Sequence, residues 1–556
     1  MTKQTYASRS SKLAVGCAAL AAICGPSSAF TEETIMPSKT TTRTERPNIV
    51  FVITDDIERF MFNALPEGRG KNLTPHLDRL EREGVLMAGQ HVASAVCTPS
   101  RFNVLTGLFA SRALNVTEDE QAVVAFTTHI HPDDNTLPKR LQQAGYRTGM
   151  AGKNHVVHGP SGPDIPLEAD PRDPEIQTAL RQYQSEYEAA IRQAGFDFAG
   201  GIYPGNPDEL RPRALRIHNM DYVTDAALRF IDQQDERAPF FLYFATTLPH
   251  GPIEPERSWD SDPLLTPFGV LDEPLQVLPP RASIGERIRA ANLKTSGPDE
   301  GTHWAAEQAP YVMLAIDDAL GALLARMESR GLLENTILFF FNDHGCDAKG
   351  TLYQGGLQFP SIAWRPGGFA AGSRRDDLVS NVDFAPTILD LAGIAYEPAQ
   401  FDGVSFRDIL EGAEQPADRT LYAEMGFSRT VRKGEWKYLA LRYPPEAVNM
   451  PMEERRRRLE EWNDHLGERG IEPVNTDPAA PFSHLTDLPG GAHAEHSTTG
   501  KKLHYYDPDQ LFNLADDPGE NHNLAGDPAY AEKLAEMKEL MRLHVQKLPG
   551  SFGEFK

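Results

Sequence analysis

Three short, uninterrupted apolar runs constrain the fold of this chain more than any other feature. They cover residues 49–53, 239–245 and 337–341. Each has the length of one strand and is rich in β-branched or aromatic residues, which is typical of strands buried on both faces. Segments with helical apolar spacing separate them. This alternation predicts an α/β fold, in which helices sandwich a large, mainly parallel sheet.

Polar residues follow the predicted strands, including a further short strand at residues 146–150. They are Asp55, Asp56, Lys153, His155, His250, Asp343 and His344. Ligands of such folds bind outside the carboxyl ends of the strands, so we expect these side chains at one edge of the sheet. Three carboxylates at two strand ends favour a hard divalent cation such as Ca²⁺. For the Asp55–Asp56 pair alone, turn and helix-cap chemistry is the alternative.

A compact Cys-Thr-Pro-Ser-Arg segment occupies residues 97–101. Proline is favoured at the first position of a helix, so a helix is expected to start at Pro99. Cys97 then lies just before a helix N-terminus, where unpaired N–H groups and the helix dipole favour an anion. Taken alone, these residues are also compatible with a buried, unreactive cysteine at position 97.

The surroundings of Cys97, Pro99 and Arg101 at residues 91–107 resemble the signature of the type I, formylglycine-dependent sulfatases. This family belongs to the alkaline phosphatase-like superfamily, and the chain is most similar to its glycan-acting members. Further motifs match in order within residues 46–530. They lie at residues 152–155, 249–252, 343–345, 349–356 and 506–521. Four positions depart from the family pattern and concern the substrate pocket: Leu108, His344, Gln354 and Gln358.

The resemblance implies that a formylglycine-generating, sulfatase-maturating enzyme converts Cys97 to formylglycine, whose hydrate is the nucleophile. It implies one Ca²⁺ per chain. The implied metal ligands are Asp55, Asp56, Cys97 in its modified form, Asp343 and His344. The implied catalytic residues are Cys97, Arg101, Lys153, His155, His250 and Lys349. Among these, Lys153, Lys349 and His250 are expected to hold the sulfate, and His250 or Lys349 to protonate the leaving oxygen.

The expected reaction is hydrolysis of a sulfate ester, on a carbohydrate such as a polysaccharide-derived oligosaccharide. Two alternatives remain open. One is a phosphate or phosphonate ester hydrolase of the same superfamily. The other is a binding protein that captures sulfated glycans because Cys97 is never converted.

The N-terminus indicates export. Residues 1–29 combine a basic start, a short apolar stretch and small residues at the end, which is typical of a signal peptide, and residues 30–45 form a polar tether. We therefore expect a periplasmic or secreted protein; a lipid anchor at Cys24 is the less favoured alternative. Cys17 and Cys24 lie in the signal, which leaves Cys97 and Cys346 without a disulfide framework.

The chain is acidic, with a net charge of −24 that falls to −27 once the three basic residues of the signal are removed. This charge argues against a nucleic-acid partner, which requires a basic surface. An anionic substrate also meets a repulsive overall field, so a local basic pocket must offset that field. No later stretch is expected to span a membrane.

The pattern changes after residue 412. Residues 46–412 are expected to form the catalytic domain and residues 413–556 a smaller α+β domain with an antiparallel sheet. Strand-like pieces at 432–439 and 503–506 and a helix near 528–546 support this division. A further helix near 452–470 carries four consecutive arginines, Arg455 to Arg458. A solvated helix with ion pairs is favoured there over a polyanion-binding patch.

Overall fold

A computed structural model describes residues 46–118, 124–125, 127–235, 238–294, 306–468, 472–473, 475–485 and 502–556. The expected signal peptide and tether lie outside these ranges. Residues Glu45–Lys556 form one compact unit, and the domain boundary near residue 412 stays a prediction. Of the helices in the described ranges, none combines the length and the apolar character needed to cross a membrane.

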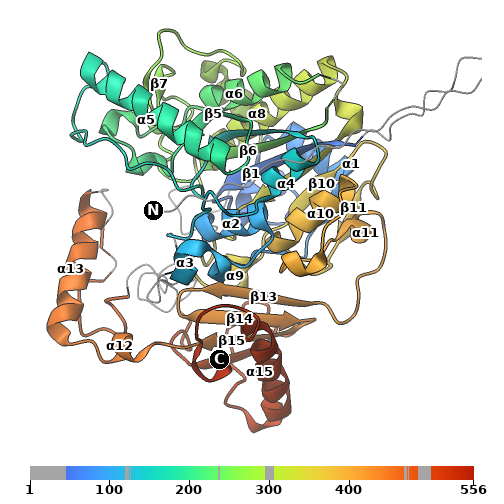
Figure 1. Ribbon diagram of the computed structural model, residues 1–556, viewed down its shortest axis with the longest axis vertical. Coiled ribbons are helices and arrows are strands. Elements are labelled where there is room, and N and C mark those ends of the chain that lie inside the picture. Colours follow the sequence, from blue (N-terminus) through green and yellow to red (C-terminus); the bar gives the residue numbers. More distant parts are fainter. Residues whose placement is uncertain are drawn as a thin grey trace, which may run out of the picture. The chain divides into compact units, whose positions relative to one another are not determined.

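An eight-stranded sheet forms the centre of this unit (Figure 1), and its strand order is β11-β2-β10-β9-β1-β6-β4-β5. Five neighbouring strands are parallel: β9 (Thr336–Asn342), β1 (Asn48–Asp55), β6 (Phe240–Pro249), β4 (Arg147–Lys153) and β5 (Phe198–Tyr203). β10 (Ser361–Trp364) runs antiparallel to β9 and β2 (Val85–Met87), and β11 (Ser373–Arg375) forms the far edge. The predicted α/β fold with a mainly parallel sheet is confirmed.

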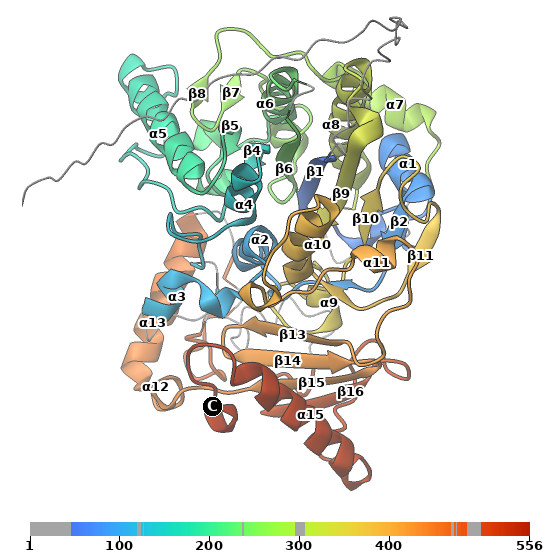
Figure 2. The same cartoon turned by 45° about the vertical axis from the view of Figure 1, so that its right-hand side comes forward.

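Both faces of the sheet are buried, because successive side chains of a strand point to opposite faces. Ile49, Phe51 and Ile53 of β1 enter one apolar cluster, and Val50 and Val52 enter another. The first face packs against α2 (Cys97–Thr106), α4 (Leu137–Gln143), α5 (Pro174–Gln193) and α10 (Phe384–Leu391). The second packs against α1 (Pro75–Glu83), α6 (Met220–Asp232) and α8 (Ala309–Ser329) (Figure 2).

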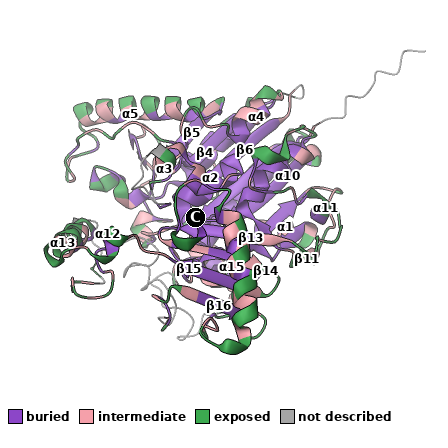
Figure 3. Ribbon diagram, turned by 60° about the horizontal axis from the view of Figure 1, so that its bottom comes forward, coloured by how far each residue is buried: buried purple, intermediate pink, exposed green. Residues whose placement is uncertain are grey.

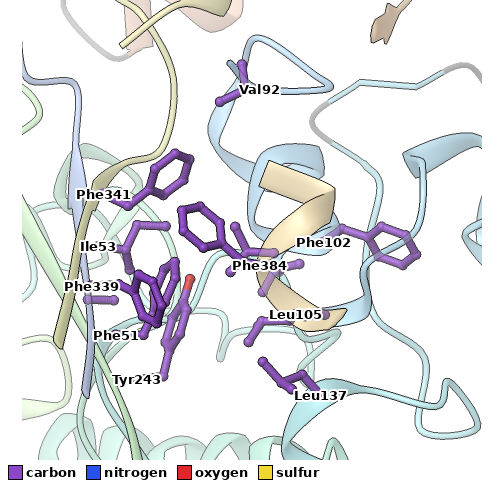
Figure 4. Packing of buried hydrophobic residues seen from close by; sticks show 14 of the residues in the cluster. Phe51, Ile53, Val92, Phe102, Leu105, Leu137, Tyr243, Phe339, Phe341 and Phe384 are labelled. Carbon is purple, nitrogen blue, oxygen red and sulfur yellow. The ribbon is translucent and has the colours of Figure 1, made fainter. Parts of the chain in front are cut away.

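Aromatic side chains fill the first of these layers. Phe51 stacks on Tyr243 of β6, with ring centroids 5.9 Å apart, and meets the edge of Phe384 of α10 at 5.0 Å (Figure 4). Full burial of one such side chain contributes about 1.5–3 kcal/mol. The strands of the main sheet are among the most deeply buried parts of the described chain (Figure 3). Their burial holds the carboxyl ends of the strands in fixed positions.

The C-terminal part contains the expected antiparallel sheet. It consists of β13 (Thr420–Met425), β14 (Ser428–Lys433), β15 (Trp436–Leu441) and β16 (Asp509–Asn513), and α15 (Ala531–Val545) packs against it. Two expectations were wrong in detail. Residues 432–439 form a hairpin, because Gly434 takes the left-handed conformation (φ 56°) that a tight turn needs. Residues 503–506 form turns, and β16 follows them.

Residues 159–215 are rich in Pro, Asp and Gly and have a helical pattern only near 174–194, so the sequence predicts an excursion over the surface with one helix. That helix exists as α5, but the segment also contains β5, which pairs with β4 in the main sheet. The two glycines of Phe-Ala-Gly-Gly-Ile-Tyr interrupt the apolar pattern of this strand, so the sequence pattern did not predict it.

The helix with the arginine run is α13 (Met452–Glu468). Arg457 pairs with Glu454 and Glu461, each at 2.6 Å, and Arg458 pairs with Glu454 at 3.0 Å. A solvated helix with intrahelical ion pairs is confirmed. The shorter elements are β3 (Gln90–His91), α3 (Leu114–Glu118), β7 (Leu265–Thr266), β8 (Gly269–Val270), α7 (Ile284–Ala290), α9 (Gln354–Leu357), β12 (Val379–Ser380), α11 (Arg407–Leu410) and α12 (Pro445–Val448).

Candidate active site

The polar residues expected at the strand ends lie together at the carboxyl edge of the main sheet. Asp55 is the last residue of β1, and Asp56 follows it in a left-handed conformation with φ 68°. Asp343 and His344 follow β9, whose Asn342 lies opposite Thr54 of β1. Parallel register therefore brings these ends together, as the alternation of strands and helices predicts.

Asn342 fixes the loop that carries Asp56. Its Oδ1 accepts hydrogen bonds from Ile57 N at 2.9 Å and Thr54 Oγ1 at 3.1 Å, and its Nδ2 donates to Ile57 O at 3.2 Å. This residue was not predicted, although its position just before Asp343 was a usable signal.

Cys97 is the first residue of α2, so the helix starts two residues earlier than expected, and Pro99 is its third residue. The first-turn N–H groups of a helix have no intrahelical acceptor, so proline is tolerated at this position too. Cys97 is buried, with Sγ 3.3 Å from Asp55 Oδ1 and 3.5 Å from His344 Nε2. Burial, followed by Asp343 and Asp55, raises the pKa of the Cys97 thiol. The unmodified thiol is therefore a poor nucleophile at neutral pH.

Arg101 lies one helical turn after Cys97 and joins two carboxylates. It is fully buried, and its Nη2 lies 3.0 Å from Asp343 Oδ2 and 3.6 Å from Asp55 Oδ1. Its Nε and Nη1 have no hydrogen-bond partner among the described residues. Arg101 thus contacts both acidic residues.

Two lysines each bind one of the neighbouring aspartates. Lys153, at the end of β4, donates to Asp55 and, at 2.6 Å, to Asn206 Oδ1. Lys349 Nζ lies 2.8 and 2.6 Å from the two oxygens of Asp56. Burial alone would raise the pKa of both carboxyls. The nearby cations together outweigh burial, with Lys153 contributing most at Asp55 and Lys349 most at Asp56, and hold the pKa of both carboxyls well below the usual range. Both lysines are therefore ammonium ions beside carboxylates.

Three histidines surround this charge cluster. His250 follows β6, and its Nε2 lies 3.6 Å from Asp56 Oδ2; 14% of its side chain is exposed, so a substrate can reach it. Buried His344 has Nε2 3.1 Å from Asp56 Oδ1. His155 is half-buried, with its Nδ1 shielded from solvent, and desolvation followed by Lys153 lowers the pKa of its imidazole well below the usual value. His155 is therefore neutral and able to accept a proton.

Four of these residues offer a metal site. Ligand atoms of Asp56, Cys97, Asp343 and His344 all lie within 4.8 Å of one another. Asp55 belongs to an overlapping group with Cys97 and His250. Burial and the neighbouring Asp55 raise the pKa of Asp343, so a cation between these two carboxylates would relieve their repulsion. The three carboxylates fit a hard divalent cation, while His344 adds a nitrogen donor.

Asn206 is the second residue that was not predicted. Besides accepting from Lys153, it donates from Nδ2 to Glu209 Oε1 at 2.8 Å, so Asn206 has a fixed orientation. Asn206 follows β5, the strand that the sequence pattern concealed, and no motif marked it. Its contact with Lys153 depends on β4 and β5 being neighbours in the sheet.

Two of the unusual positions contact each other. Gln354 Nε2 lies 3.2 Å from His91 Nε2 and donates to Gln358 Oε1 at 3.0 Å. Glu520 Oε2 accepts from Gln354 N at 2.6 Å, which connects this pair to the C-terminal part. These glutamines follow Lys349 in the chain. Cys97 and Cys346 are both free thiols.

Comparison with known proteins identifies the family. The family model described as Sulfatase matches residues 47–394. An N-acetylglucosamine-6-O-sulfatase of Bacteroides thetaiotaomicron is 25% identical over 448 residues, which cover 67% of this chain and 73% of that protein.

Solved structures share the fold. One was determined in complex with its substrate, D-glucosamine-2-N,6-O-disulfate; it has a TM-score of 0.55 and 20% identity and covers 90% of this chain and 98% of that one. A phosphonate monoester hydrolase of Agrobacterium radiobacter has a TM-score of 0.54 and 19% identity, covering 90% and 96%. The family model spans more than half of the chain, including the Cys97 helix and the strand ends around it, and the chain therefore belongs to the sulfatase family, as a sulfuric ester hydrolase.

Proposed function

We propose that this enzyme is exported and removes sulfate from a carbohydrate, using a formylglycine at position 97 and one bound Ca²⁺. One observation carries the proposal: Cys97 is buried at the meeting point of three aspartates, two lysines and an arginine, where its own thiolate is disfavoured. Such surroundings suit a group that works without ionising as a thiol. Conversion requires a formylglycine-generating enzyme as a partner of the newly made chain.

The calcium ion would be held by Asp55, Asp56 and Asp343, with His344 beside them and the modified side chain at position 97 completing the set. When bound, it would supply positive charge to the sulfate oxygens and lower the pKa of a hydroxyl that contacts it. The oxygen donors of three aspartates support Ca²⁺ over a softer metal.

Side chains of this chain supply the remaining chemistry. The ammonium groups of Lys153 and Lys349 neutralise charge that develops on the sulfate oxygens. His250 is partly exposed and lies 3.6 Å from Asp56, so it can hold the leaving oxygen and protonate it. Neutral His155, close to Lys153 in the chain, accepts a proton from the side chain at position 97 when sulfate is released. Arg101 orients Asp55 and Asp343.

Two similarities support a sugar substrate. The Bacteroides relative is named as an N-acetylglucosamine-6-O-sulfatase, and one solved structure with this fold holds a disulfated glucosamine. We therefore propose a sulfated hexosamine, as part of an oligosaccharide, as the first substrate class to assay. The signal-like N-terminus supports a periplasmic or secreted location, where polysaccharide fragments are met.

Mass spectrometry of the peptide that contains Cys97 tests the central claim. The expected result is loss of the thiol sulfur in the active protein and, in Cys97→Ala, turnover reduced to background. An intact thiol in fully active protein would refute the formylglycine proposal.

Matched aryl substrates separate the proposed activity from its alternatives. A sulfatase should show a far higher kcat/KM on an aryl sulfate than on the aryl phosphate or phosphonate monoester. The reverse order would favour the phosphonate hydrolase alternative, and sugar binding without turnover would favour the binding protein. Desulfation of a panel of defined sulfated oligosaccharides then identifies the sugar.

A further inference from the structure

Four arginines crowd into two loops beside the active site. Arg211, Arg213 and Arg216 lie between β5 and α6, and Arg257 lies after β6. The chain as a whole has a net charge of −24, yet no acidic residue occurs between Leu210 and Met220. This concentration of positive charge is not explained by the residues that the proposed chemistry uses.

The arginines are held close together, and most lack acidic partners. Buried Arg216 donates from Nε to Leu210 O at 3.0 Å, and Arg257 Nε donates to Arg216 O at 3.0 Å. Arg213 pairs with Glu168 at 2.8 Å. Within the described part of the chain, no carboxylate oxygen lies within 4.0 Å of the guanidinium groups of Arg211, Arg216 or Arg257.

The direction of the pKa shift of Arg216 is consistent with its position among other arginines. Burial, followed by the neighbouring Arg213, lowers its pKa, while Asp208 opposes this shift; Arg257 and Arg211 add to it. A buried guanidinium surrounded by like charges is costly unless an anion compensates it.

Both arginine loops start from residues of the active site. Asn206, the partner of Lys153, lies four residues before Leu210, whose carbonyl holds Arg216. Arg257 comes seven residues after His250 in the other loop. His218 joins the two loops: its N donates to Arg257 O at 2.8 Å, and its Nε2 lies 2.9 Å from Pro252 O. The cluster therefore lies at the carboxyl edge of β5 and β6, where the active site also lies.

We propose that Arg211, Arg216 and Arg257 form a second anion-binding subsite, which holds an acidic group of the substrate other than the sulfate that is cleaved. The inference rests on the proposed function and narrows its substrate to a glycan with at least two acidic groups. Guanidinium groups bind sulfate and carboxylate oxygens through paired hydrogen bonds. Such a subsite also offsets locally the repulsion that an anionic substrate meets from an acidic protein.

Matched sugars with one and two sulfates test the subsite, for which glucosamine 6-sulfate and glucosamine-2-N,6-O-disulfate are suitable. The variants are Arg211→Gln, Arg216→Gln and Arg216→Lys in the full-length enzyme. The control is Arg374→Gln, which removes one positive charge from β11 at the opposite edge of the sheet. Thermal unfolding confirms that each variant is folded.

Each Gln variant should raise KM for the disulfated sugar about tenfold or more, as expected for loss of one charge-assisted hydrogen bond. Its kcat, and its kcat/KM for the monosulfated sugar, should stay within about twofold of the wild type. Arg216→Lys should recover part of the affinity, and Arg374→Gln should match the wild type. Replacing the second sulfate by a uronic acid on a neighbouring sugar shows whether the subsite prefers sulfate or carboxylate.

Equal losses on both sugars, or no loss on either, would overturn the subsite. If the wild type cleaves neither sugar, the proposed activity on them has failed, and binding decides the subsite separately. Calorimetry should then show tighter binding of the disulfated sugar, weakened by Arg216→Gln and unchanged by Arg374→Gln. Equal affinity of the wild type for both sugars would refute the subsite.

Discussion

Arg101 shows how much one buried side chain contributes to this site. It bridges Asp343 at 3.0 Å and Asp55 at 3.6 Å, and all three side chains are fully buried. Replacing it with alanine leaves two carboxylates facing each other without their shared cation. We expect Arg101→Ala to destabilise the protein by about 3–5 kcal/mol, as for other broken buried ion pairs, and to reduce kcat/KM at least a hundredfold.

Urea unfolding and steady-state kinetics measure the two effects of Arg101→Ala. Arg112→Ala is the matched control, because Arg112 also binds an aspartate, Asp402, through two nitrogens but is 31% exposed. An exposed pair of this kind contributes about 1 kcal/mol or less. Similar costs for the two variants would contradict the bridging role of Arg101.

The repulsion between Asp55 and Asp343 leads to a prediction for metal removal. Because Asp55 raises the pKa of Asp343, a bound divalent cation should stabilise the folded chain. Saturation at about a hundred times the dissociation constant contributes about 2.7 kcal/mol. Chelation by EDTA should lower the Tm by several degrees, and added Ca²⁺ should restore it. Asp343→Asn should show a much smaller calcium-dependent shift, and a Tm that ignores EDTA and Ca²⁺ in the wild type would contradict the site.

The residues of the candidate active site were predictable from the sequence where a local motif or an adjacent apolar strand marked them. Asp55, Asp343 and Lys153 each directly end or follow an apolar strand, so their convergence followed from the fold class. Asn206 was not predictable, since its contact with Lys153 spans 53 positions and depends on β5. The protonation states of the active-site side chains could not be predicted from the sequence either, because they depend on distances between segments that are remote in sequence.

Among the secondary-structure elements, β4 depends on one glycine. Gly152 adopts φ 99°, and a Cβ at this position would overlap the carbonyl oxygen of Ala245 on β6. The pairing of β4 with β5 also shifts register between Ala151 and Lys153. The Lys153 side chain, which pairs with Asp55, follows this irregularity directly, so Gly152 fixes the position of a residue that we propose binds the sulfate.

Gly152→Ala is therefore expected to lower both stability and activity. The new methyl group must push β4 away from β6, which should cost more than the roughly 1–2 kcal/mol of a left-handed alanine alone and reduce kcat/KM by about a hundredfold. Gly331→Ala is the control, because Gly331 also has a positive φ of 67°, but a Cβ there would meet no atom of the described residues within 4 Å. Thermal unfolding and kinetics of both variants measure the difference, and equal effects would contradict the packing argument.

Strand prediction succeeded where apolar runs were continuous and failed where glycine interrupted them. The run at residues 49–53 became β1, extended by polar residues at both ends. β5 and the β14–β15 hairpin were missed because Gly200, Gly201 and Gly434 have conformational freedom but no apolar side chain to mark a strand or its end.

At the scale of the whole molecule, one buried ion pair connects the C-terminal sheet to the active-site loop. Lys437 of β15 donates to Glu520 at 2.6 Å and to Leu352 O at 2.5 Å, and Glu520 accepts from Gln354 N at 2.6 Å. Leu352 lies in the same loop as Lys349, and Gln354 is the first residue of α9, which follows that loop. The sequence predicted an antiparallel sheet in this region, but it could not predict this contact, which spans more than 80 positions.

Lys437→Met should destabilise the protein by about 3–5 kcal/mol, because it leaves Glu520 buried without its cation. The double variant Lys437→Met/Glu520→Gln should recover part of that loss, since no uncompensated charge remains. If the pair positions the Lys349 loop, kcat/KM for an aryl sulfate should fall in the single variant and partly recover in the double variant.

The surface pair Lys433–Glu536, which joins β14 to α15 at 3.2 Å, is the control, and its disruption should cost less than about 1 kcal/mol. Additive effects of Lys437 and Glu520 in the double-mutant cycle would show that the two residues act independently, and the C-terminal sheet would then support the active site through packing alone.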